Sequence, residues 1–246
     1  MRDFVYKYGL ICLVIVGYLG ISLPAYGAAT ETTAAAGLSG AATAAPGAEV
    51  QIFSIGVTGD ASTAVLAINV TLSDLSSATG ITASDLTQLQ VYRSADNVLG
   101  GDTPVGSAQT SINIGSATSL SFSDTPPASE VFYIVGATFS TTVTENHAFK
   151  VGFAASGAFA GSGAFGSAVA ASDANKLTIS VTATKLVFST QPSGSTSGSA
   201  LSTQPVVTAQ DANNNTDLDF AEWCSDICWV GLDRNGRWRI IYASSE

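Results

Sequence analysis

Residues 131–153 read VFYIVGATFSTTVTENHAFKVGF. Valine, isoleucine and aromatic residues fill Val131–Val135 and Ala148–Phe153, and β-strands favour these residue types. The polar residues Glu145 and Asn146 lie between the two runs and are typical of a turn. This stretch therefore predicts β-strands joined by a loop, with a turn that leads directly into the second strand.

Similar short runs recur along the chain, with glycine, proline and aspartate between them, and this pattern favours an all-β sandwich. The one helical turn that we expect lies at 82–89, where Ser84 can cap free backbone amides. The sequence has no long amphipathic helix, which excludes α/β folds with phosphate-binding loops. A match to the dinucleotide fingerprint at 161–166 is therefore interpreted as a flexible loop or a small-residue strand. The other predicted strands are Val50–Ile55, Val65–Leu72, Leu89–Tyr92, Ser111–Ile114, Ser119–Phe122, Ala137–Phe139 and Leu177–Thr182.

The composition excludes several classes of protein. With 46% apolar and 11% charged residues, the chain of 246 residues can form a core, and it is not a disordered acidic tail. Its net charge of −10 repels phosphate, so we expect no nucleic-acid partner. The single histidine, His147, lacks an identifiable nucleophile and a third group to orient it. We therefore interpret His147 as a surface or turn residue and expect no catalytic residues and no enzymatic activity.

The N-terminus predicts export. Residues 1–27 combine Arg2 and Lys7 with an apolar run and a small-residue end at Gly27, which is the pattern of a cleaved secretory signal peptide. The apolar run, Leu10–Leu23, has 14 residues, whereas a membrane span needs about 20. We therefore expect a secreted or cell-surface protein with no stable membrane insertion after cleavage.

The rest of the chain divides into four segments by composition. Residues 28–47 are small and polar without periodicity and predict a flexible leader. Residues 48–182 predict the β-sandwich domain. A second β-unit is expected at 183–220, and residues 221–246 form an atypical tail.

The second unit has a recognisable order of features. A strand at Leu186–Phe188 is followed by the kink Gln191-Pro192, a Gly/Ser loop, a strand at Pro205–Gln210 and an Asp/Asn turn. This order resembles the opening half of an immunoglobulin-like repeat that occurs in tandem in large bacterial secreted and surface proteins. The β-sandwich segment before it is similar to the larger β-domain that often precedes such repeats. The resemblance implies a partial, truncated immunoglobulin-like module at 183–220 and a structural or adhesive function.

The tail differs in composition from everything before it. Residues 221–246 contain all three tryptophans, together with Cys224 and Cys228, whereas the preceding residues contain no tryptophan. Translation of an alternative reading frame produces such a change, so one hypothesis is a frameshift or a truncated gene. The other hypothesis is a genuine cap, in which 231–242 form a hairpin with an Asn-Gly turn. The two cysteines could also form a local disulfide.

An acidic stretch after the second strand of this unit is a candidate metal site. Its oxygen-bearing side chains occupy the ligand positions of an EF-hand loop, which binds Ca²⁺. However, Thr216 stands where an EF-hand needs glycine and no helix precedes Asp211, so the stretch also fits a simple turn. A second acidic loop at 96–102 either holds a cation or forms a hairpin turn with positive φ at its two glycines. The candidate Ca²⁺ ligands are Asp211, Asn213, Asn215, Asp217, Asp219 and Glu222.

Together these features predict a secreted or cell-surface structural or adhesive protein that is not an enzyme and that has no cofactor apart from the candidate Ca²⁺. Its expected partners are an extracellular surface, a matrix or a polysaccharide. The alternative is an extracellular carbohydrate-binding module, Ca²⁺-dependent if the acidic stretch binds metal. That alternative requires exposed aromatic rings, for which Tyr92 and Tyr133 are the residues to test. Most aromatic residues of 50–182 are instead phenylalanines within apolar runs, and we expect them in the core.

Overall fold

The computed structural model of the chain describes residues 29–59, 64–75, 80–154, 165–194, 196–220, 229–232 and 238–241. The regular structure of these residues is almost entirely β-strand, so the predicted all-β fold is confirmed. Within these ranges no helix has the length and apolar character needed to span a membrane. The predicted signal peptide, residues 161–164 of the match to the dinucleotide fingerprint and the two C-terminal cysteines lie outside the described residues.

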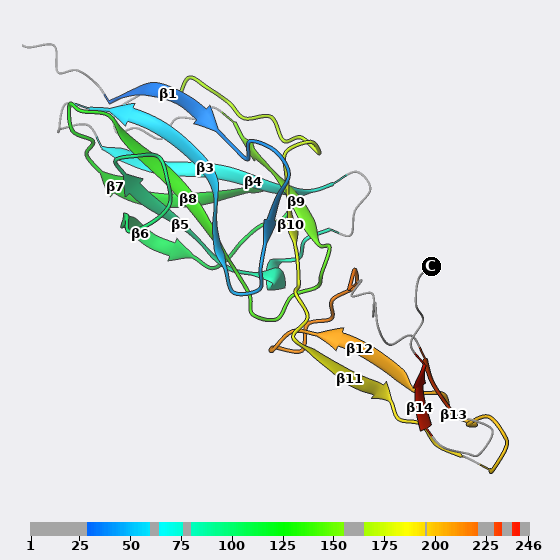
Figure 1. Cartoon of the computed structure of the whole chain (residues 1–246). Coiled ribbons are helices and arrows are strands. Elements are labelled where there is room, and N and C mark those ends of the chain that lie inside the picture. Colours follow the sequence, from blue (N-terminus) through cyan, green and yellow to red (C-terminus); the bar gives the residue numbers. More distant parts are fainter. Residues whose placement is uncertain are drawn as a thin grey trace, which may run out of the picture.

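Two five-stranded sheets form a sandwich, and its layers can be followed in Figure 1. The first sheet has the order β1 (Thr30–Ala36), β3 (Glu49–Thr58), β8 (Val131–Phe139), β5 (Leu86–Ser94) and β6 (Thr103–Gln109), with all neighbours antiparallel. The second sheet has the order β2 (Ala42–Ala44), β10 (Lys176–Ile179), β9 (Ala148–Phe153), β4 (Val65–Asp74) and β7 (Ala117–Asp124), where the β2–β10 pair is parallel.

Aromatic pairs join the two sheets across the core. Phe139 of β8 stacks on Phe149 of β9 with ring centroids 6.2 Å apart, and Phe53 of β3 packs on Phe153 of β9 at 4.8 Å. These four rings are buried, which confirms that they belong to the core. Each ring removes a large apolar area from water, so these pairs supply much of the free energy that holds the sheets together.

The prediction of a flexible leader at 28–47 is wrong. β1 pairs with β3 at one edge of the first sheet, and β2 pairs with β10 at one edge of the second. Glu31 of β1 accepts hydrogen bonds from the backbone amides of Gly166 and Ser167 at 2.6 and 3.0 Å. Small residues carry no apolar periodicity, but backbone pairing at a sheet edge does not require it.

Two local predictions also need correction. The segment 111–114 was expected to be a strand, but it is an irregular connection with one bridge, from Ile114 to Leu72. The short helical turn is a 3₁₀ turn, η1 (Ala83–Asp85), and it is preceded by Thr82 rather than capped by Ser84. By contrast, the predicted turn at 145–146 and the strand that follows it are confirmed.

The acidic loop at 96–102 forms the hairpin turn between β5 and β6. The Asp96 carboxylate accepts the Val98 amide at 3.1 Å, and the Asp102 carboxylate accepts the Gly100 amide at 2.9 Å. Gly101 adopts a positive φ of 76°, as a tight turn requires of glycine. The carboxylates of Asp96 and Asp102 therefore stabilise the hairpin turn by accepting its backbone amides.

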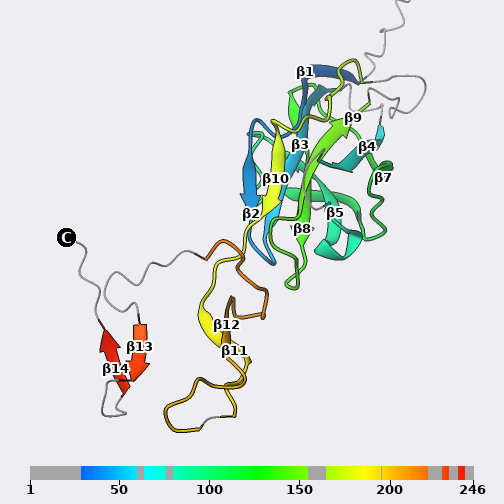
Figure 2. The ribbon, with the colours of Figure 1, turned by 90° about the vertical axis from the view of Figure 1, so that its right-hand side faces the viewer.

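Beyond one end of the sandwich lies a two-stranded antiparallel sheet of β11 (Lys185–Thr190) and β12 (Val206–Gln210), as both views show (Figures 1 and 2). Its apolar side chains are largely open to solvent, with Leu186 64% and Phe188 51% exposed. β13 (Trp229–Leu232) and β14 (Trp238–Ile241) form the hairpin predicted for the tail. The Asn-Gly turn expected between them lies outside the described residues.

Candidate cation site at the end of the sandwich

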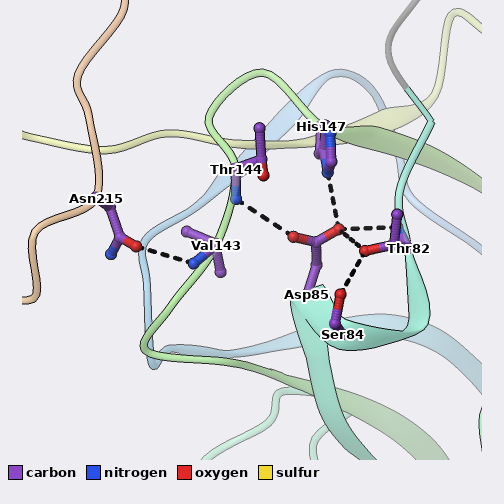
Figure 3. A network of polar contacts seen from close by, with 7 residues as sticks. All are labelled: Thr82, Ser84, Asp85, Val143, Thr144, His147 and Asn215. Carbon is purple, nitrogen blue, oxygen red and sulfur yellow. Dashed lines mark hydrogen bonds and ion pairs between the residues drawn. The ribbon is translucent and has the colours of Figure 1, made fainter.

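The loop between β8 and β9, residues 140–147, is anchored to the sandwich by the carboxylate of Asp85 (Figure 3). Asp85 ends η1 and is only 3% exposed. Its Oδ2 atom accepts hydrogen bonds from the backbone amide and the hydroxyl of Thr82, at 2.8 and 2.7 Å. The same carboxylate contacts the loop at two points: Nδ1 of His147 at 2.8 Å and the amide of Thr144 at 3.3 Å. One buried side chain therefore fixes both ends of the turn.

Burial raises the pKa of Asp85, but the hydrogen bonds from Thr82, His147 and Thr144 outweigh it and leave the pKa below its ordinary value. Asp85 is therefore ionised at neutral pH and only accepts hydrogen bonds, so Nδ1 of His147 carries the proton that it donates. Of the two interpretations of His147, as a surface residue or as a turn residue, the first is wrong, because His147 is buried. It does close the turn, since its amide donates to the carbonyl of Thr144 at 3.4 Å.

Asn215 attaches the segment after β12 to this loop, as Figure 3 shows. Its Oδ1 accepts the amide of Val143 at 2.9 Å, and its Nδ2 donates to the carbonyl of Thr141 at 2.8 Å. Nδ2 also donates to Asp211 Oδ2 at 2.8 Å. Asn215 is itself buried, and its amide group pairs with two part-buried backbone groups of the sandwich loop.

Two further carboxylates hold the same segment. Asp217 Oδ2 accepts the amide of Ala183, in the connection between β10 and β11, at 2.8 Å. Glu145 Oε2 accepts the amide of Leu218. We call the contact between the β8–β9 loop (140–147) and the segment after β12 (211–218) the joint. A pocket of about 270 Å³ lies there. It is lined by Thr142, Val143, Thr144 and Glu145 from the loop and by Asn214, Asn215, Thr216 and Leu218 from the segment.

The carboxylates of Glu145, Asp217 and Asp219 gather at this joint, with one oxygen of each within 4.8 Å of the others. Glu145 is 3% exposed, Asp217 is half-buried and Asp219 is exposed. Burial raises the pKa of Glu145, and the negative charges of Asp219 and Asp217 raise it further, while the amides of Leu218 and Val181 act in the opposite direction. The three carboxylates thus form a cluster of like charge.

The six ligands predicted from the EF-hand spacing have different surroundings. Asp211 closes its own turn by accepting the amides of Asn213 and Asn215 at 2.8 and 2.9 Å. Asn213 is exposed, and Asn215 binds the sandwich loop. Asp217 and Asp219 face Glu145, and Glu222 lies outside the described residues.

Sequence reasoning missed Glu145 as a member of the cluster. It appeared only as a turn residue, 72 positions before Asp217 in the chain. Ligand spacing within one loop detects local sites alone, and no pattern in the sequence links these two distant turns.

No protein-family model matches the chain, and no curated protein is similar to it. One solved structure that is similar to part of it is that of AvmM, which catalyses macrocyclization in alchivemycin A biosynthesis. The match has 12% sequence identity and a TM-score of 0.26, and it covers 50% of this chain and 71% of AvmM.

The prediction that the chain is not an enzyme is contradicted by this neighbour, which is an enzyme, and we withdraw it. With a TM-score of 0.26, the likeness assigns no reaction and no catalytic residue to this chain.

Proposed function

We propose that the chain is a secreted or cell-surface structural protein in which the β-sandwich holds the following β-unit in a fixed orientation. The observation that carries the proposal is the joint itself. Asn215 hydrogen-bonds to two backbone groups of the β8–β9 loop, and Glu145 of that loop accepts the backbone amide of Leu218. Asp217 accepts the amide of Ala183 in the connection between β10 and β11. A flexible linker between domains would have few contacts of this kind.

The composition supports an extracellular setting for this function. The predicted signal peptide directs the chain out of the cell, and a net charge of −10 favours solubility. Rigid β-units in sequence suit a spacer or an adhesive surface. The two tyrosines of the sandwich give the carbohydrate-binding alternative no support: Tyr133 is completely buried, and the hydroxyl of half-buried Tyr92 donates to Glu49 at 2.8 Å.

Asn215→Ala is expected to loosen the joint. The substitution removes the part-buried hydrogen bonds to the Thr141 carbonyl and the Val143 amide. A hydrogen bond of this kind contributes about 0.5–1.5 kcal/mol, so the loss of both should cost about 1–3 kcal/mol. Small-angle X-ray scattering should show a broader distribution of shapes, and a protease should cut the connection at 180–184 faster than in the unsubstituted chain.

Asn213→Ala is the matched control, because Asn213 is an exposed asparagine two positions away in the same turn. It should leave both scattering and cleavage unchanged. Equal cleavage rates for the unsubstituted chain and Asn215→Ala would contradict a joint held by Asn215.

A further inference from the structure

We propose that Glu145, Asp217 and Asp219 bind one Ca²⁺ ion, which crosslinks the β8–β9 loop of the sandwich to the segment after β12. Ion binding is a property of these residues themselves and does not depend on the proposed structural function. It also differs from the EF-hand arrangement predicted from the sequence, because one ligand comes from the sandwich and Asn213 takes no part.

Two of the three carboxylates each have a buried oxygen without a hydrogen-bond partner among the described residues. Glu145 is 3% exposed, and its Oε1 atom is fully buried and has no hydrogen bond of ordinary geometry among the described residues, although the Val181 amide also acts on this carboxylate. The Oδ1 atom of Asp217 is likewise buried without a partner among these residues. In each carboxylate the other oxygen accepts a hydrogen bond from a backbone amide. Each carboxylate therefore has one hydrogen-bonded oxygen and one without a partner. A buried charged oxygen without a partner is costly, and a bound cation removes that cost.

The spacing of the oxygens suits Ca²⁺. Ca²⁺ binds oxygens at about 2.4 Å, so two ligands on opposite sides of the ion are about 4.8 Å apart and adjacent ones are closer. The three carboxylates offer oxygens that all lie within 4.8 Å of one another. Because Asp219 is exposed, water can complete the six to eight ligands that Ca²⁺ takes.

The charge of the cluster also calls for a cation. Three carboxylates lie together, and the Lys and Arg ion pairs found among the described residues, Arg93–Asp124 and Lys150–Asp173, include none of them. The nearby ammonium group of Lys185 donates instead to Asn214 Oδ1 at 2.7 Å and to the carbonyl of Ala212 at 3.4 Å. A divalent ion would offset the mutual repulsion of these three closely spaced negative charges.

Calorimetric titration of the chelator-treated full chain with CaCl₂ tests the site. We expect one ion per chain with a Kd of about 10⁻⁴–10⁻³ M, the range of extracellular modules with few charged ligands. Glu145→Gln keeps an acceptor for the Leu218 amide but removes the charge, and Asp219→Asn changes an exposed side chain. Each should weaken binding about tenfold or more, because the charge count of the ligands tunes the affinity.

Two control variants test whether binding is specific to these three carboxylates. Asp102→Asn removes one negative charge at the distant β5–β6 turn, and Asn213→Ala removes a ligand of the EF-hand arrangement alone. Neither should change the affinity. Thermal unfolding provides a second readout: at the same CaCl₂ concentration, the Tm of the unsubstituted chain and of both control variants should rise clearly more than that of Glu145→Gln.

Three results would overturn the proposal. They are the absence of saturable binding by the unsubstituted chain, an equal loss of affinity in Asp102→Asn and Glu145→Gln, and loss of binding in Asn213→Ala with full binding in Glu145→Gln. The last result would place the ion in the EF-hand arrangement instead.

Discussion

Replacing Asp85 with alanine is expected to lower the free energy of unfolding by about 3–5 kcal/mol. The substitution removes the acceptor of hydrogen bonds from Thr82, Thr144 and His147 at once. Each donor that stays buried without a partner costs about 1–3 kcal/mol. Because Thr144 and His147 belong to the β8–β9 loop, the loop should also lose its fixed conformation.

Urea denaturation of the two proteins measures the difference. Ser84→Ala is the matched control, since Ser84 is exposed and its hydroxyl bonds only to that of Thr82 among the described residues, at 2.8 Å. It should cost no more than about 0.5 kcal/mol. A loss in Asp85→Ala as small as that in the control would show that Asp85 does not anchor the loop.

Asp85→Asn should reveal the contribution of the charge through its dependence on pH. The pKa of Asp85 is lowered by folding, so its ionised form stabilises the native state above the unfolded value of 3.8. The difference in unfolding free energy between the unsubstituted chain and Asp85→Asn should therefore be complete above that pH. It should shrink as the pH falls through the lower, folded pKa. A difference that grows on acidification has the wrong sign and would contradict this role.

Phe149→Ala is the second substitution with a large expected effect, at about 3–5 kcal/mol. Phe149 is completely buried on β9 and stacks on Phe139 of the opposite sheet, so alanine leaves a cavity at the centre of the sandwich. The surrounding strands are hydrogen-bonded into two sheets and cannot close it. Denaturation by urea again gives the free energy.

Phe132→Ala provides the comparison for this cavity. Phe132 lies on β8 next to the fully buried Tyr133 but is itself only half-buried, since successive side chains of a strand point to opposite faces. Its truncation should cost clearly less. Equal losses at the two positions would mean that the stacked pairs are not the centre of the core.

The sequence alone predicted the strands with strong apolar character. β9 and the turn before it follow directly from apolar residues after Glu145 and Asn146. β1 and β2 were not predicted, because their small and polar residues show no apolar periodicity. They form strands because the edges of the two sheets provide backbone hydrogen-bond partners. Tertiary contacts, rather than local preference, decide such segments.

The candidate site was only partly accessible to sequence reasoning. Asp217 and Asp219 stood out because they belong to a dense acidic stretch. Glu145 did not, because its place in the cluster depends on how the β8–β9 loop meets the segment after β12. The burial of His147 was missed for the same reason, since its partner Asp85 is distant in the chain.

The central claim is that the sandwich and the β11–β12 unit are held as one body by the joint. Nitrogen-15 relaxation of backbone amides in the full chain measures the rotational correlation time of each unit separately. We predict the same correlation time for amides of β8 and β9 as for those of β11 and β12. A shorter correlation time for β11 and β12 would mean that the second unit tumbles independently, and it would contradict the claim.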